Sequence, residues 1–315
     1  MNFPRVIHRL GELPAVGSLL RQASYLYREG SVVTMPFGLA AGSKWMRHHR
    51  YVSGYWLGIY EPGIQRALSR LIDEGDVVYD VGANAGFFTL LAARLTGESG
   101  SVFAFDPLPD NVASIRDQIA VNLLKNVRVI QGAVSNLPGH ASFSLGPNNS
   151  MAHISNVDEP ADFTVETVAL DSFAGATGGG PSMLLPEFPE TQPSVRAPDS
   201  LPVSRTVIEV DPVASNVTQI ERKDCLESLE DRIAPRPNVI KIDVEGAEVK
   251  VLEGAVKILS AVHAPKLLVE LHGREVAAEA CAFLAAMKYE IFDLEFCPIV
   301  SGIESSRHIV ALPTR

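Results

Sequence analysis

The fold is decided by the stretch Val77-Val78-Tyr79-Asp80-Val81-Gly82-Ala83-Asn84-Ala85-Gly86 and by the residues up to Asp106. An amphipathic helix is expected over Phe87–Leu95, and a second apolar run, Val102–Phe105, ends at Asp106. Each apolar run is therefore followed closely by a carboxylate, and a glycine-containing turn links the first run to the helix. This order is typical of a strand–loop–helix–strand unit that holds a nucleotide-like ligand at the carboxyl ends of its strands.

The same alternation of apolar strands and amphipathic helices continues along the chain. Strands are expected over Val127–Gln131, Val239–Val244, Lys266–Leu271, Tyr289–Leu294 and His308–Leu312. Helices are expected over Tyr60–Ile72, Pro107–Leu124, Gly246–Leu259 and Val276–Met287. Strands that alternate with helices at this spacing predict an α/β fold: a doubly wound, mostly parallel sheet with helices on both faces.

One stretch inside the domain breaks this pattern. Between Gly175 and Pro202 the chain holds six prolines and a run of three glycines, which predicts an insertion at about residues 175–205 instead of a packed element. Two similar pieces flank it, Phe163–Phe173 and Asn216–Leu229. Either piece could be the strand that leads into the second half of the sheet, and the sequence leaves both open.

The N-terminal part differs from the rest in charge. Residues 1–59 are expected to form a helical extension, with helices over Leu13–Tyr27 and Phe37–His49, before a main domain of residues 60–315. The first 60 residues carry seven lysines and arginines against two acids, although the whole chain has a net charge of −10. The cluster Lys44–Arg50 mixes cations with aromatic rings. It either touches a membrane or other anionic surface or packs on the acidic body of the protein.

Composition narrows the class of protein and its compartment. The chain has 315 residues and is 46% hydrophobic, so a well-buried core is expected. A net charge of −10 argues against nucleic acid as the main partner. Three cysteines without a CxxC spacing predict neither a disulfide framework nor a zinc site. The start shows no signal peptide, and no apolar run reaches the roughly 18–20 residues of a transmembrane helix, so a soluble, cytoplasmic protein is expected.

The order of residues in the first motif bears on the ligand. In Asp80-x-Gly82-x-x-x-Gly86 the glycines allow a sharp turn and a close approach of the ligand, and the next helix presents free N–H groups. Asp106 ends the following strand, where a carboxylate can accept hydrogen bonds from both hydroxyls of a ribose. An acid ahead of the first glycine repels a pyrophosphate but suits an ammonium group. S-adenosylmethionine is cationic and has no phosphate, so this order favours it over NAD.

Two further strands end in acids at the same predicted edge of the sheet. Asp243 closes one of them, and Glu270 closes the next, with His272 two residues later. These three are the candidate catalytic residues, and His272, then Asp243, is the candidate general base. Glu248 either stabilises the start of a helix or belongs to the site. Although Asp243, Glu245, Glu270 and His272 offer metal-ligand atoms, their spacing is not compact, and no required metal is predicted.

The residues Val78–Gly86, Ile240–Glu248 and Val251–Ala255 together resemble the FkbM-type methyltransferases, and the second motif is the most specific. The resemblance covers about Tyr60–Pro313 and is interrupted by the insertion. It implies a class I S-adenosylmethionine-dependent fold, with a seven-stranded sheet and one antiparallel strand near the end. It also implies methyl transfer to oxygen, commonly on a sugar, glycolipid, polysaccharide or polyketide-like hydroxyl.

The resemblance carries residue roles onto this sequence. Cofactor-binding residues implied by it are Asp80, Gly82, Asn84, Gly86, Asp106, Ala133 and Asp243. Asp106 stands where the family more often has Glu before Pro, and Ala133 falls where the adenine edge is expected. Asp243 is expected near the transferred methyl group. Two other interpretations remain: a nicotinamide-dependent oxidoreductase, which the glycine spacing disfavours, and a non-catalytic cofactor-binding protein. The sequence names neither the acceptor nor the oligomeric state.

Overall fold

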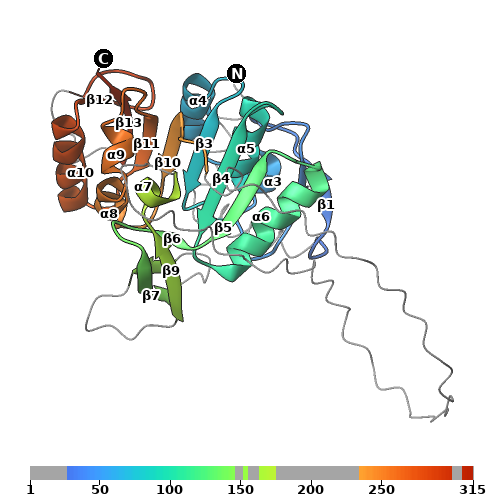
Figure 1. Ribbon diagram of the computed structural model, residues 1–315. Helices are drawn as coiled ribbons and strands as arrows, with labels where there is room; N and C mark the ends of the chain where they lie inside the picture. The colour runs from blue at the N-terminus through green and yellow to red at the C-terminus, as the bar shows by residue number, and fades with distance from the viewer. Residues whose placement is uncertain (1–26, 146–151, 155–162, 175–233, 300–306, 315) are drawn as a thin grey trace, which may run out of the picture. The chain divides into compact units, whose positions relative to one another are not determined.

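The computed structural model describes residues 27–145, 152–154, 163–174, 234–299 and 307–314. Within these ranges the main sheet has seven strands in the order β12-β13-β11-β10-β3-β4-β5 (Figure 1). They are β3 (Val77–Val81), β4 (Ser101–Asp106), β5 (Val127–Gln131), β10 (Val239–Ile242), β11 (Lys266–Glu270), β12 (Tyr289–Phe292) and β13 (His308–Pro313). Only β13 runs against its neighbours in this part of the chain. The predicted mostly parallel sheet with one antiparallel strand near the C-terminus is confirmed.

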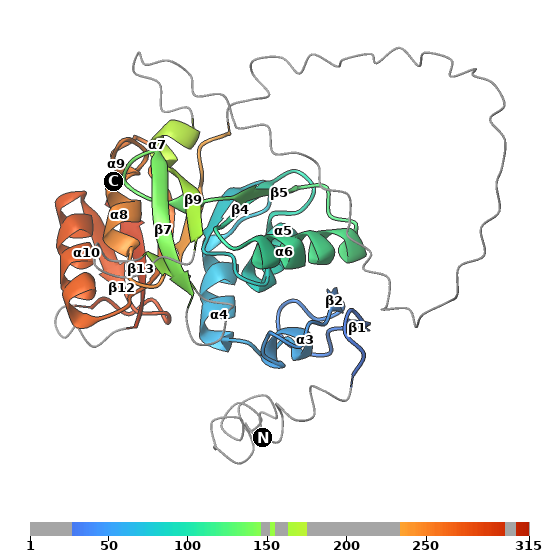
Figure 2. The same ribbon diagram turned by 90° about the horizontal axis from the view of Figure 1, so that it is seen from below.

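Helices follow the strands as the alternation predicts (Figures 1 and 2). They are α4 (Pro62–Leu71), α5 (Phe87–Thr96), α6 (Pro109–Asn122), α8 (Glu248–Glu253), α9 (Val256–Leu259) and α10 (Arg274–Ala286). Successive strand residues point to opposite faces of the sheet. Val78 and Val102 join the core formed with Leu68 of α4 and Leu91 of α5. The sheet is therefore buried on the face that carries α4 and α5 by side chains of alternate strand positions.

The opposite face is covered near its centre by aromatic rings. The Tyr79 ring of β3 lies 5.4 Å, between ring centroids, from Phe103 of β4, and 5.6 Å from Phe173. Phe173 belongs to the short helix α7 (Leu170–Phe173). The Tyr79 hydroxyl donates a hydrogen bond of 2.8 Å to the backbone carbonyl of Pro235, just before β10. Tyr79 therefore contacts the last helix before residue 175 and the first residues after 233.

The N-terminal segment corrects one prediction. The helix expected over Phe37–His49 is wrong: strands β1 (Val32–Thr34) and β2 (Lys44–Met46) form an antiparallel hairpin there, followed by the short helix α3 (Gly54–Leu57). The loop explains the difference, because Gly38 and Gly42 have φ values of +74° and +86° and follow a proline. A helix has no place for that backbone conformation.

The hairpin is attached to the main domain by packing and by hydrogen bonds. Trp45 is 1% exposed, and its ring centroid lies 6.1 Å from that of Phe87 in α5. The backbone N–H of Met46 donates to the Gln118 side chain of α6 at 2.9 Å. The other expected helix, Leu13–Tyr27, lies outside the described residues except for Tyr27. The boundary at residue 59 stays a prediction.

The helix expected over Gly246–Leu259 is in fact two helices, α8 and α9, with a break at Gly254. A Cβ at Gly254 would lie 2.1 Å from the Ser135 carbonyl oxygen, so the chain passes close to another segment there. The Asp171 carboxylate accepts hydrogen bonds from the backbone N–H groups of Lys257 and Ile258, at 2.8 and 2.9 Å. These contacts satisfy the free N–H groups of a new helix start, which favours the break.

A second, four-stranded sheet lies between β5 and β10 in the chain. Its order is β6-β9-β7-β8, with β6 (Ala133–Val134), β7 (Gly139–Leu145), β8 (Ala152–Ile154) and β9 (Phe163–Val168). Phe163–Phe173 therefore supplies β9 and α7 and adds no strand to the main sheet. The alternative, Asn216–Leu229, and the insertion at about 175–205 lie outside the described residues.

All described residues fall within one compact unit. Among its helices, none combines the length and the apolar character that a membrane crossing requires.

Candidate active site

The glycine loop after β3 is held between β4 and β10. The N–H groups of Gly82 and Ala83 both donate to the Phe105 carbonyl at 3.0 Å. Gly82 has a φ of +76°, and a Cβ there would lie 1.7 Å from the carbonyl oxygen of Asp243. Only glycine fits at this position, because any side chain would overlap the backbone that follows β10. The two sequence motifs therefore meet at Gly82.

The two other loop positions differ in their relation to the pocket at this edge of the sheet. Asn84 adopts a left-handed backbone with φ of +48° and lines that pocket. Gly86 has φ of +89° and precedes α5; a Cβ there would lie 3.2 Å from Ile115 of α6. Gly86 is not among the pocket-lining residues. It allows α5 and α6 to pack closely beneath the loop.

The pocket opens at the carboxyl ends of β3, β4 and β10. Its wall combines the glycine loop, the end of β4, the segment between β5 and β7, and the residues after β10. The predicted site residues in this wall are Gly82, Asn84, Asp106, Ala133 and Asp243. Gly132 and Val134, expected with Ala133 at the adenine edge, also line it, and residues that the sequence did not single out include Leu108, Asn111 and Phe143. Phe143 comes from the second sheet, so its membership could not be foreseen from a Rossmann-like pattern alone.

Asp106 is the most buried carboxylate of the pocket wall, with 4% exposure. Its Oδ2 accepts a hydrogen bond from the Asn84 backbone N–H at 2.8 Å. Its Oδ1 accepts from the Leu108 backbone N–H at 2.9 Å and from the Asn111 side-chain amide at 3.0 Å. Burial raises the pKa of Asp106 to about 7, although these hydrogen bonds oppose the shift. The carboxylate is fixed in orientation and faces the pocket.

Asp80 has a different place from the one its motif suggests. Its carboxylate is 1% exposed and is not part of the pocket wall. Oδ2 accepts the Thr89 hydroxyl at 2.6 Å, and Oδ1 lies 3.2 Å from the ammonium of Lys241. The ammonium partner predicted for Asp80 is therefore a lysine of the protein itself. Lys241 stands in the second motif, but its residue type alone indicates no role there.

Lys241 connects both motifs from β10. Besides Asp80, its ammonium donates to the Gly82 carbonyl at 3.0 Å and lies 3.5 Å from Asp243 Oδ2. Burial lowers the pKa of Lys241, but the carboxylates of Asp80 and Asp243 raise it by more, so its pKa stays above the ordinary value. Lys241 is thus a buried, fully charged cation that holds the loop and two carboxylates together.

Asp243 and Glu245 form the acidic part of the pocket wall. Burial raises the pKa of both carboxyls; Lys241 opposes the shift at Asp243, and His272 opposes it at Glu245. Glu245 has a left-handed backbone with φ of +52°, an uncommon conformation for a residue with a side chain. It begins the turn that carries the chain from β10 into α8. Together with Asp106, the pocket wall therefore has three carboxyls with a raised pKa.

His272 lies beside this wall, surrounded by carboxylates. Its Nδ1 is 2.7 Å from Glu248 Oε1, and its Nε2 is 3.4 Å from Glu245 Oε2 and 3.5 Å from Glu270 Oε1. Hydrogen bonds with Glu248 and Glu270 raise its pKa to about 10, against the effect of burial. The imidazole is therefore protonated at neutral pH and cannot accept a proton there. Glu248, 0% exposed, holds this cation, so it belongs to the surroundings of the site.

Glu270 is held in a separate cluster at the end of β11. Its Oε1 accepts two hydrogen bonds from Arg307, from Nε at 2.7 Å and from Nη2 at 2.6 Å. His308 on β13 pairs directly with Glu270 on β11, and its Nε2 lies 3.3 Å from Glu270 Oε2. Burial would raise the pKa of Glu270, but His272, His308 and Arg307 outweigh it and hold the pKa below the ordinary range. Neither Glu270 nor His272 lines the pocket.

Among the residues that the structure describes, two groups have metal-ligand atoms within 4.8 Å of one another: Asp243, Glu245 and His272, and Glu61, Glu270 and His308. In the first group the protonated imidazole already supplies a positive charge among the carboxylates. That no metal is required stays a prediction.

The comparisons with known proteins agree with this geometry. The family model described as "Methyltransferase FkbM domain" matches residues 80–183 and 191–291, more than half of the chain. The 31-O-demethyl-FK506 methyltransferase FkbM of Streptomyces tacrolimicus is 31% identical over 181 residues, which are 55% of this chain and 68% of that protein. The arsenite methyltransferase of Halobacterium salinarum is 36% identical over 64 residues, which are 20% of this chain and only 16% of that protein.

Solved structures give a weaker likeness. Methyltransferase FkbM from Methylobacillus flagellatus KT aligns with a TM-score of 0.37 and 13% identity, over 75% of this chain and 43% of that one. A SAM-dependent O-methyltransferase from Thermotoga maritima aligns with a TM-score of 0.37 and 10% identity, over 81% and 66%. Family membership therefore rests on the sequence match and on the strand order. The chain belongs to the FkbM methyltransferase family, and it is a methyltransferase with a class I, Rossmann-like fold.

Proposed function

We propose that this methyltransferase uses S-adenosylmethionine to methylate a hydroxyl oxygen of a sugar, glycolipid, polysaccharide or polyketide-like acceptor. The observation that carries the choice of cofactor is the charge of the pocket wall. Asp106, Asp243 and Glu245 all line the pocket, and the nearby cation of Lys241 lies closer to Asp80 and the Gly82 carbonyl, at 3.2 and 3.0 Å, than to Asp243, at 3.5 Å. Such a wall suits a sulfonium and an ammonium group, whereas a pyrophosphate would be repelled. The same observation disfavours a nicotinamide-dependent oxidoreductase.

The residues present fit this cofactor. Gly82 leaves its backbone bare at the pocket, and Asp106 presents a fixed carboxylate that suits a ribose diol. Ala133 and Val134, with Phe143 of β7, provide small and apolar surface for an adenine ring. Asp243 and Glu245 supply negative charge for the ammonium group of the cofactor's amino acid part. Asp80 does not have this role, because its carboxylate is paired with Lys241.

When bound, the cofactor supplies an electrophilic methyl group on a positively charged sulfur. The chain's own task is then alignment of the acceptor and removal of its hydroxyl proton. We assign the proton acceptor to Asp243, whose raised pKa and position in the pocket wall suit a base better than the protonated His272. His272 has a structural role instead: its imidazolium forms ion pairs with Glu245 through Nε2 and with the buried Glu248 through Nδ1.

Transfer to oxygen is supported by one relative. The name of the Streptomyces tacrolimicus protein, 31-O-demethyl-FK506 methyltransferase, indicates that it methylates an oxygen. The matched part covers 68% of that protein. The identity of the acceptor is part of the proposal.

Binding and turnover test the proposal separately. Thermal shift with S-adenosylhomocysteine and with NAD comes first, since a ligand of the folded state raises the melting temperature. We expect a rise of several degrees with S-adenosylhomocysteine only, and a loss of that rise in Asp106→Ala. Incubation with methyl-labelled cofactor and a panel of hydroxylated sugars and glycolipids then measures transfer. Stabilisation by NAD alone would overturn the choice of cofactor, and binding without any transfer across the panel would favour a non-catalytic protein.

A further inference from the structure

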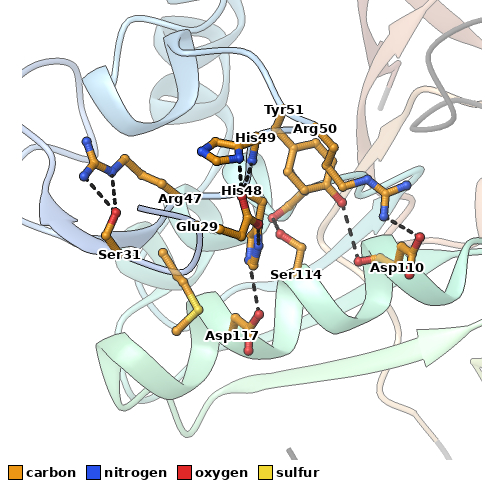
Figure 3. A network of polar contacts seen from close by, with 12 residues as sticks. Glu29, Ser31, Arg47, His48, His49, Arg50, Tyr51, Asp110, Ser114 and Asp117 are labelled. Atoms are coloured by element: carbon orange, nitrogen blue, oxygen red, sulfur yellow. Dashed lines mark hydrogen bonds and ion pairs between the residues drawn. The ribbon is translucent and has the colours of Figure 1, made fainter. Parts of the chain in front are cut away.

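Several side chains of the basic segment Lys44–Arg50, before α3, contact other segments of the protein, and Lys44 and Arg50 are themselves exposed. Arg47 places its guanidinium 4.1 Å from the ring centroid of Tyr27, and Arg50 Nη1 lies 2.5 Å from Asp110 Oδ2 (Figure 3). His48 lies between Glu29, at 2.8 Å, and Asp117 of α6, at 3.2 Å. Two of these cations therefore contact the acidic side of α6, as expected for packing on the body of the protein.

The residue that follows this segment continues the network toward the pocket. Tyr51 is 7% exposed, and its hydroxyl donates to Asn111 Oδ1 at 2.7 Å. Asn111 is 2% exposed and turns its amide nitrogen to Asp106 Oδ1 at 3.0 Å. A tyrosine hydroxyl and one asparagine thus connect the N-terminal segment with the carboxylate of the pocket.

A second branch reaches the glycine loop. The Tyr51 and Ser114 hydroxyls lie within hydrogen-bonding reach of each other (Figure 3), and the Ser114 hydroxyl donates to the Ala85 carbonyl at 3.1 Å. Tyr51 therefore contacts three residues of α6: the backbone carbonyl of Asp110 at 3.5 Å, Asn111, which donates to Asp106, and Ser114, which donates to the loop that precedes α5.

We propose that Tyr51 is a positioning residue for the ribose of the cofactor, acting through Asn111 on Asp106. This inference rests on the proposed function, because it takes the pocket to be the S-adenosylmethionine site. An asparagine amide can present either its oxygen or its nitrogen to a neighbour. The Tyr51 hydroxyl donates to the oxygen, so the nitrogen is left for Asp106. Without that donor, Asn111 loses a buried hydrogen bond to its Oδ1, and the amide nitrogen that donates to Asp106 is held less firmly.

The conservative variant Tyr51→Phe removes only the hydroxyl. Calorimetric titration of wild type and variant with S-adenosylhomocysteine and with its 3′-deoxyribose analogue separates positioning from general damage. We expect the variant to bind S-adenosylhomocysteine about 5–10-fold more weakly, the loss of one hydrogen bond to a charged network. Binding of the deoxy analogue, which lacks a ribose hydroxyl for Asp106, should change less than twofold. The wild type's preference for the full ribose therefore shrinks.

Tyr289→Phe is the matched control. Its hydroxyl is also buried and donates to a backbone carbonyl, that of Pro265, at 3.0 Å, away from the pocket. This control should bind both ligands like the wild type. An equal loss of affinity for both ligands in Tyr51→Phe, or no loss for either, would overturn the inference while leaving the proposed function intact. Failure of the wild type to bind S-adenosylhomocysteine would overturn the proposed function itself.

A second variant keeps the test decisive if Tyr51→Phe folds poorly. Asn111→Ser cuts the same connection beside Asp106 and should show the same reduced preference for the full ribose. In the double variant the two losses should not add, because both changes break one chain of contacts. Additive losses would mean that Tyr51 acts by another route, and the inference would be wrong.

Discussion

Lys241 and Asp80 are direct partners across the parallel strands β10 and β3, and their charged atoms lie 3.2 Å apart. Both side chains are buried, with 4% and 2% exposure. Removal of one partner leaves the other charge buried without its counterion. We therefore expect Lys241→Met to lower the free energy of unfolding by about 3–5 kcal/mol. Urea denaturation of the wild type and the variant measures this difference in the free energy of unfolding.

Two variants complete this experiment. The double variant Lys241→Met, Asp80→Asn should recover part of the stability, since Asp80 is no longer a buried charge without a counterion, whereas Asp243 still lacks the Lys241 cation. Arg66→Met removes a partner from an exposed pair of similar length, Arg66 to Glu295 at 3.1 Å, and should cost less than about 1 kcal/mol. A similar small loss in Lys241→Met would show that the buried pair contributes no more than a surface pair.

Gly82→Ala should lower the free energy of unfolding and abolish cofactor binding. The new Cβ would overlap the Asp243 carbonyl, and the backbone has a φ of +76°. Gly42→Ala is the control, because Gly42 has a similar φ of +86°, yet its new Cβ would have no atom of the described residues within 4 Å. Strain alone costs about 1–2 kcal/mol, so Gly82→Ala should be clearly the more destabilised of the two. Equal melting temperatures would contradict the close approach of the two motifs.

Affinity for S-adenosylhomocysteine should depend on pH through Asp106. Its pKa is raised to about 7, so the carboxylate is largely protonated below that pH and accepts ribose hydrogen bonds less well. We expect the affinity to rise between about pH 6 and pH 8 and then to level off. In Asp106→Asn the affinity should be weak and flat over this range. Calorimetric titration gives the affinities, and the melting temperature at each pH excludes unfolding as the cause.

His272 should make stability fall at high pH. Its folded-state pKa of about 10 is above its ordinary value of 6.5 because of Glu248 and Glu270. The stabilisation is therefore complete below about pH 6.5 and is lost as the pH rises toward 10. Chemical denaturation between pH 6 and pH 10 should show this decline in the wild type and a smaller one in His272→Gln. His140→Gln, at an exposed site, should follow the wild type.

The main sheet could be predicted because its signals are local. Apolar runs and the acids at their ends, such as Asp106 and Asp243, place the strands and their carboxyl edge without knowledge of partners. The N-terminal hairpin could not be predicted in the same way. Its apolar residues fit a helical spacing, and only the backbone at Gly38 and Gly42 excludes a helix. The close passage of Gly254 by Ser135 is likewise a contact between distant segments.

The site was predictable to the same degree. Asp106 and Asp243 lie in the pocket wall, where strand ends were expected to meet. The role of Asp80 depends on the register between β3 and β10. Lys241 lies directly opposite Asp80 and pairs with its carboxylate, and sequence order alone does not predict this pairing. The protonation of His272 depends on carboxylates from two separate segments, Glu245 and Glu248 after β10 and Glu270 at the end of β11. Asn111 could have been proposed from its position, because a side chain in the first turn of the helix after Asp106 lies near the end of β4.

Tyr79 has one more consequence, which concerns how the chain can change length. Its ring contacts Phe173, and its hydroxyl is bonded to Pro235. The last described residues before position 175 and the first described residues after position 233 therefore lie beside the same side chain. A segment whose two ends meet at one point can lengthen or shorten without shifting any strand of the sheet. Relatives of this protein are thus free to differ in the number of residues between these two points, and a short linker should be able to replace residues 175–233.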